Sequence, residues 1–181
     1  MGETIVRIGK ALLIHLLIGA GVLATIWFMA DTFGDASLAL QNDYAEAADG
    51  GASVLNELGD ARGQMLKWAI LALSFSWLFS SLFVALAQRR AARGYSEGGS
   101  MFAAWIGLFI VTILAAVAAW WRQVSLLDIG TLIASNNYAI SLVTGFIGTA
   151  LAYYLATGLA VRLPLKRSVP LADVLLPNFW N

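Results

Sequence analysis

Residues 102–121 read FAAWIGLFIVTILAAVAAWW, a run without a charged side chain. A helix needs about 20 residues to cross the hydrocarbon core of a bilayer, which is about 30 Å thick. Inside lipid every backbone polar group must pair within the protein, and an unbroken helix pairs them within its own segment. This stretch therefore predicts a transmembrane helix, and it decides the class of fold.

Three further apolar runs of similar length have approximate limits 8–30, 65–87 and 138–161. Of the 181 residues, 60% are hydrophobic and 12% are charged, whereas soluble domains have about 45–50% apolar and about 25% charged residues. All three prolines follow the last run, so no proline ring interrupts a predicted helix. The sequence predicts an all-α integral membrane protein with one four-helix transmembrane domain, residues 1–161, and a proline-containing tail, residues 162–181.

The distribution of charge predicts how these helices are oriented. The basic residues beside the first, second and fourth runs are Arg7 and Lys10, then Arg89, Arg90 and Arg93, then Arg162, Lys166 and Arg167. The segment 31–64 instead contains seven acidic residues and one basic residue, Arg62. Because Lys and Arg are concentrated in cytoplasmic loops, we expect both termini to be cytoplasmic and the acidic segment to lie outside. We expect the membrane to be a bacterial inner membrane.

The acidic segment 31–64 has a pattern of its own. Apolar residues recur at helical spacing on both sides of Gly50 and Gly51, which interrupt the pattern. We therefore expect two short helices that form a hairpin resting on the outer membrane face. The first apolar run is longer than the apolar core of a secretory signal, about 7–15 residues, so we expect it to be retained as an anchor.

Small residues recur at helical spacing within the predicted spans. In lipid, helices associate mainly through close packing, which small side chains permit. The candidate packing positions are Gly21 in the first span, Gly107 in the third, and Gly145, Gly148, Ala152 and Ala156 in the fourth. This pattern does not distinguish packing within one chain from packing between chains.

The polar residues at membrane depth are the candidates for function. His15 is the single histidine of the chain, and an ionisable side chain inside a membrane is a functional candidate by default. The second span contributes hydroxyls from Ser74, Ser76, Ser80 and Ser81. A neutral imidazole bonded to a hydroxyl of a neighbouring helix is one interpretation, and a polar path for a proton, an ion or a headgroup is the other. With no Cys and no second His, the sequence predicts no metal site and no cofactor.

Two segments on the expected cytoplasmic side, the connection after the second run and the tail, contain residues that could contact lipid or another subunit. Arg89, Arg90 and Arg93 can interact with anionic lipid. In the tail, Pro170, Pro177, Phe179 and Trp180 suggest an extended segment whose ordering cost is low. We expect this segment either to dock on another subunit or to lie among lipid headgroups. Nothing in the sequence indicates binding to nucleic acid.

No catalytic constellation is present, because the chain has neither a positioned base for a nucleophile nor a phosphate-binding loop. We therefore expect a non-enzymatic membrane subunit of a transport or secretion type complex, whose partners are lipids and other membrane subunits or copies of itself. One alternative is a homo-oligomeric channel or small transporter that uses His15 and the serines. The other is a lipid- or quinone-interacting enzyme anchor, in which Tyr153 and Tyr154 would contact the ligand.

Overall fold

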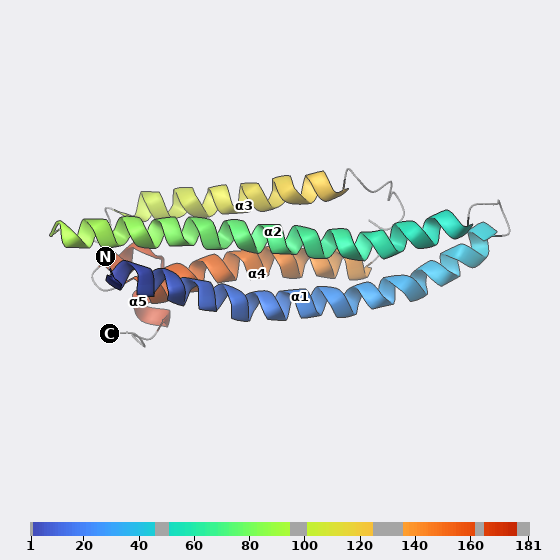
Figure 1. Cartoon of the computed structure of the whole chain (residues 1–181), viewed down its shortest axis with the longest axis horizontal. Coiled ribbons are helices and arrows are strands. Elements are labelled where there is room, and N and C mark those ends of the chain that lie inside the picture. Colours follow the sequence, from blue (N-terminus) through green and yellow to red (C-terminus); the bar gives the residue numbers. More distant parts are fainter. Residues whose placement is uncertain (1, 46–50, 95–100, 125–135, 162–164, 177–181) are drawn as a thin grey trace.

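The computed structural model describes residues 2–45, 51–94, 101–124, 136–161 and 165–176, with side chains for 2–29, 63–94, 101–123, 139–161, 166–172 and 174–176. These residues form helices and connecting turns (Figure 1). The elements are α1 Gly2–Ala45, α2 Gly51–Ala92, α3 Phe102–Val124, α4 Asn136–Ala160, the 3-10 helix η3 Leu165–Ser168 and α5 Ala172–Leu175.

Among the described residues, the prediction of an all-helical protein with four helices long and apolar enough to span a membrane is confirmed. The parts of α1 to α4 that are long and apolar enough to cross a membrane are Gly2–Met29, Gly63–Ala92, Phe102–Gln123 and Ala139–Ala160. Each contains most of one predicted span. The first begins at Gly2 because α1 itself begins there, and Arg7, which was expected to precede the span, is buried within the bundle.

The acidic segment differs from its prediction. Its two helices are continuations of α1 and α2, which are 44 and 42 residues long. Figure 1 shows that both continue past the ends of α3 and α4 instead of turning onto a membrane surface. The sequence of α1 after Met29 contains no proline, and its one glycine, Gly34, costs only about 1 kcal/mol in a helix. The helix therefore has no reason to stop where the apolar residues end.

The four long helices pack unequally. α4 packs against both α1 and α2, whereas α3 packs mainly against α2 and makes few contacts with α4. We call the end of the bundle where α1 begins and α4 ends the terminal end, and the opposite end, toward the α1–α2 extension, the hairpin end (Figure 1).

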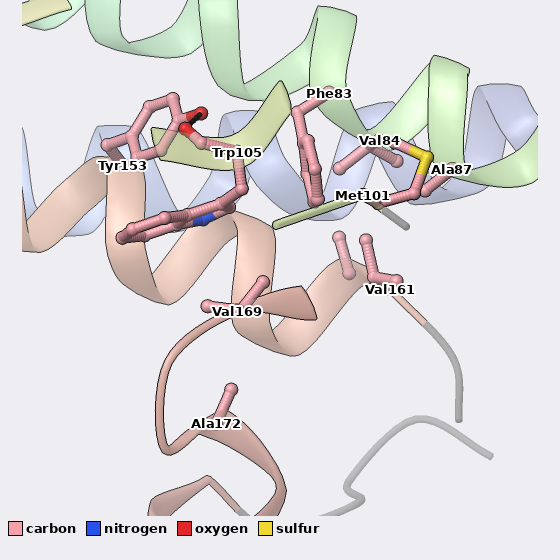
Figure 2. Packing of buried hydrophobic residues seen from close by; sticks show 10 residues of the cluster. Phe83, Val84, Ala87, Met101, Trp105, Tyr153, Val161, Val169 and Ala172 are labelled. Carbon is pink, nitrogen blue, oxygen red and sulfur yellow. Dashed lines mark hydrogen bonds between the residues drawn. The ribbon is translucent and has the colours of Figure 1, made fainter. Parts of the chain in front are cut away.

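Buried apolar residues gather in a cluster at each end. The terminal cluster joins α2, α3, α4 and the segment after α4 through Phe83, Val84, Ala87, Met101, Trp105, Tyr153, Ala160, Val161, Val169 and Ala172 (Figure 2). The hairpin cluster is formed by Val22, Ile26, Met65, Trp68 and Ala69. The polar residues considered below include a group between these clusters, where α1, α2 and α4 meet.

Candidate functional site

His15 lies on the buried face of α1. This face repeats every four residues through Arg7, Ala11 and His15, as a helical stripe should. The imidazole is only 5% exposed. Its Nδ1 atom lies 2.7 Å from the carbonyl oxygen of Ala11, and its Nε2 atom lies 2.9 Å from the Ser76 hydroxyl on α2. The contact expected between histidine and a hydroxyl of a neighbouring helix is therefore present.

Ser76 extends this contact to a third helix. Its hydroxyl lies 3.0 Å from the carbonyl oxygen of Thr149 on α4, and the Thr149 hydroxyl donates to Gly145 of its own helix at 2.8 Å. His15, Ser76 and Thr149, which we call the His15 cluster, are all buried. Three helices are thus connected by polar contacts at a depth where water is scarce.

Counting hydrogens defines the states of the His15 cluster. A carbonyl oxygen can only accept, so Nδ1 must carry a hydrogen to bond with Ala11. In neutral imidazole Nε2 is then an acceptor, and the Ser76 hydroxyl can donate to it. Ser76 has one hydrogen, so in this state it divides that hydrogen between His15 on α1 and Thr149 on α4. The arrangement holds a neutral histidine without needing a counter-ion.

The other serines of α2 do not join the His15 cluster. Ser74 is exposed and donates to Ile70 at 2.7 Å, and Ser80 is buried and donates to Trp77 at 3.0 Å. The Ser81 hydroxyl is covered and has no hydrogen-bond partner among the described residues, as is also true of Trp77 Nε1 one turn earlier. The four hydroxyls of the predicted cluster therefore point in different directions, and only Ser76 meets the histidine.

The small residues of α4 lie inside the chain. A Cβ added at Gly145 would overlap the Trp68 ring, and one added at Gly148 would overlap the Val22 side chain. Ala152 and Ala156 are fully buried. These positions let α1 and α2 approach the backbone of α4 closely.

Gly21 and Gly107 are placed differently from the glycines of α4. Both lie on exposed faces, and a Cβ added at either would meet no atom within 4 Å. They therefore make no helix contact within the described part of the chain.

Arg7 makes a buried contact that its sequence pattern, an orientation signal beside the first span, does not indicate. Arg7 is 3% exposed, donates from Nη1 to the Ala160 carbonyl at 2.5 Å, and pairs with Glu3 at 3.0 Å. Ala160 is the last residue of α4, and a cation stabilises a helix at this end. The available signal was the helical spacing, because Arg7 lies two steps of four residues before His15 and so falls on the same face of α1.

The tail was expected to contact another subunit or lipid headgroups, and the described part of it also contacts its own chain. Tyr154 donates from its hydroxyl to the Pro170 carbonyl at 2.8 Å, and Val169 and Ala172 belong to the terminal cluster (Figure 2). Pro177, Phe179 and Trp180 lie outside the described residues.

The arginines after the second span lie on exposed surface. Arg89 and Arg90 are in the last turn of α2, where positive charge is favourable. Arg93 follows and is also exposed, and its backbone N–H donates to Arg90. This placement leaves their predicted contact with anionic lipid sterically open.

Within the described residues, no group of three or more His, Cys, Asp or Glu side chains could hold a metal ion. The groups that do come together are one imidazole, two hydroxyls and helix carbonyls, which can bind or relay a proton. Comparison of the chain with protein-family models, with curated proteins and with solved structures finds no match.

Proposed function

We propose that this chain is a non-enzymatic subunit of a larger membrane assembly of the transport or secretion type. Its rigid unit is formed by α1, α2 and α4, and partner helices bind to small-residue faces on the outside of that unit. The observation that carries the proposal is the position of two pairs of small residues spaced by four. Ala20 and Ala24 are exposed on α1, and Ala103 and Gly107 are exposed on α3.

These outward pairs support contacts between chains. Small-xxx-small spacing lets two membrane helices approach closely, and such packing is the main source of helix association in lipid. The small residues of α4 are already used within the chain. Gly21, beside Ala20, likewise faces open space. The helices that would use these positions must therefore come from another subunit or from a second copy.

The two alternative functions have less support. For a channel, His15 and Ser76 should face an aqueous path, but their polar atoms bond to each other and to helix carbonyls. For a lipid or quinone anchor, Tyr153 and Tyr154 should offer free hydroxyls. These hydroxyls instead donate to the Trp105 and Pro170 carbonyls.

Assembly size in native membranes tests the proposal. Gly107→Leu adds bulk to the outward face of α3, where a Cβ meets no atom of the described chain within 4 Å. After extraction in mild detergent, we expect the wild type to migrate in a complex larger than one chain and the variant to move to a smaller species. Leu114→Ile, on the same exposed helix face, is the matched control and should leave the complex intact. A wild type that is monomeric, with no copurifying protein, would overturn the proposal.

We also propose the orientation in which the terminal end faces the cytoplasm of a bacterial inner membrane. The arginines at the end of α2, together with Lys166 and Arg167, support it under the positive-inside rule. The chain has no cysteine, so Ala92→Cys provides a single reporter at this end. A membrane-impermeant thiol reagent should label it in inverted vesicles but not in intact cells, and the reverse result would refute the orientation.

A further inference from the structure

The segment after α4 folds back onto the end of that helix. Lys166 donates from Nζ to the Leu176 carbonyl at 2.6 Å, which closes the segment into a loop. Tyr154 holds the middle of the loop through Pro170. Val169 and Ala172 are fully buried beneath it. The loop is therefore attached at its start, its middle and its end.

Leu176 and Ala172 lie close to Gly158 of α4, and this contact fixes the position of α5. A Cβ added at Gly158 would overlap the Leu176 side chain and would lie 3.2 Å from the Ala172 Cβ. Gly158 is in the last turn of α4, which ends at Ala160. The loop thus lies at the level where the span Ala139–Ala160 ends. Figure 1 shows α5 beside the bundle at this end, with α2 extending further out than α5.

Three large apolar side chains of this loop point away from the protein. Leu171, Val174 and Leu175 are 64%, 77% and 62% exposed. Leu171 has a φ of 57°, the one positive φ outside glycine among the described residues. A leucine is disfavoured in that conformation, and the contacts on both sides of it hold the backbone there. The loop therefore keeps an apolar surface outward although a polar one would be favoured in water.

We propose that α5 is an interfacial anchor, which places Leu171, Val174 and Leu175 at the boundary between headgroups and acyl chains beside the terminal end of the bundle. The apolar surface continues directly from the end of a span, where this boundary lies. Arg167, which is exposed, precedes α5 in the same loop, and the exposed Arg89 and Arg90 end α2 at the same end of the bundle. Apolar side chains next to basic ones are typical of segments that lie in a membrane interface.

Single-cysteine spin labelling tests the anchor. The cysteine-free chain allows a nitroxide at Val174→Cys. Leu114→Cys, in the middle of an apolar span, is the lipid-facing reference, and Ala92→Cys, which follows the charged Arg89 and Arg90, is the aqueous reference. All three positions are exposed. The purified chain is reconstituted at low density into vesicles of zwitterionic and anionic phospholipid. The measurement compares how often the nitroxide collides with two reagents. Oxygen is concentrated in lipid, so frequent collision with it indicates a label in the membrane. A water-soluble nickel chelate is excluded from lipid, so frequent collision with it indicates a label in water. Leu114 lies near the middle of the span Phe102–Gln123, and the oxygen-to-nickel ratio rises with depth in the bilayer. We therefore expect the ratio at Val174→Cys to lie between those at Ala92→Cys and Leu114→Cys.

Two results would overturn the anchor. A ratio equal to that at Ala92→Cys would place α5 in water. A label that neither reagent reaches would show that protein covers α5. In a second variant, Leu171→Asp should shift the ratio at Val174→Cys toward nickel, and no shift would also count against insertion. Because the vesicles contain no other subunit and the chain is present at low density, the outcome does not depend on whether the chain joins other subunits.

Discussion

Replacing Gly145 by alanine tests the packing of α4 directly. The added Cβ would overlap two atoms of the Trp68 ring, so the ring must move. The ring is fully buried, its Nε1 donates to the Ala116 carbonyl at 2.9 Å, and its centroid lies 5.1 Å from that of Phe146. Movement of Trp68 would therefore loosen a hydrogen bond to α3 as well as the contact with α4.

The expected change in the free energy of unfolding is the sum of three contributions, two that destabilise the fold and one that stabilises it. Overpacking a close-packed site costs about 1–3 kcal/mol. Weakening an interhelical hydrogen bond in a membrane protein adds about 0.6 kcal/mol. Alanine is favoured over glycine within a helix by about 1 kcal/mol, which acts in the opposite direction. We therefore expect Gly145→Ala to lower the free energy of unfolding by about 0.6–2.6 kcal/mol.

Unfolding in mild detergent by titration with sodium dodecyl sulfate, followed by circular dichroism, measures this change. Gly9→Ala is the matched control, because Gly9 is exposed on α1 and a Cβ there meets nothing within 4 Å. It should raise the free energy of unfolding by up to about 1 kcal/mol. The same substitution is thus expected to have opposite signs at the two positions.

A double-mutant cycle identifies the cause of the Gly145 effect. Trp68→Phe removes the ring atoms that the new Cβ would meet, so Gly145→Ala should cost much less in that background. The packing argument is refuted if Gly145→Ala is as stable as the wild type, or if its cost is unchanged when Trp68 is phenylalanine.

Three further predictions concern the buried polar contacts. Ser76→Ala should lower the free energy of unfolding by about 0.6–1.7 kcal/mol, while Ser74→Ala, whose hydroxyl bonds within its own helix, should have little effect in the same titration. With ¹⁵N-labelled histidine, NMR at neutral pH should show the hydrogen of His15 on Nδ1; a hydrogen on Nε2 alone would contradict the bond to the carbonyl one turn before it. Arg7→Met should cost up to about 2 kcal/mol, because the Ala160 carbonyl at the end of α4 loses its cation. Arg7→Lys should recover part of this loss, and equal stability of the two variants would argue against a charge effect.

Length and hydropathy are local properties, so the spans could be predicted closely. The predicted run 102–121 corresponds to the helical segment Phe102–Gln123, and the predicted run 138–161 corresponds to Ala139–Ala160. The burial of Arg7 could not be predicted in the same way. A guanidinium can be buried where it finds Glu3 and a helix-terminal carbonyl, and both partners become known only when α1 and α4 are placed side by side.

The candidate site was predicted in its residue types but not in its geometry. Spacing could place His15 on one face of its helix, but it could not select Ser76 over Ser74, Ser80 or Ser81. That choice depends on the rotation and register of α2 against α1 and α4. The 2.9 Å contact between His15 and Ser76 is the result of that register.

The small residues illustrate the same division between local and tertiary information. Gly107 and Gly145 both suit close helix contact, because neither has a Cβ. The packing of the helices places Gly145 against Trp68 and leaves Gly107 on an exposed face of α3, and the sequence alone does not distinguish the two positions. By itself the sequence determined that this is a multi-helical membrane protein, since a helix satisfies its own backbone in lipid whatever surrounds it. The tertiary structure decided which faces are used within the chain and which remain exposed, because close packing depends on residues from several helices at once.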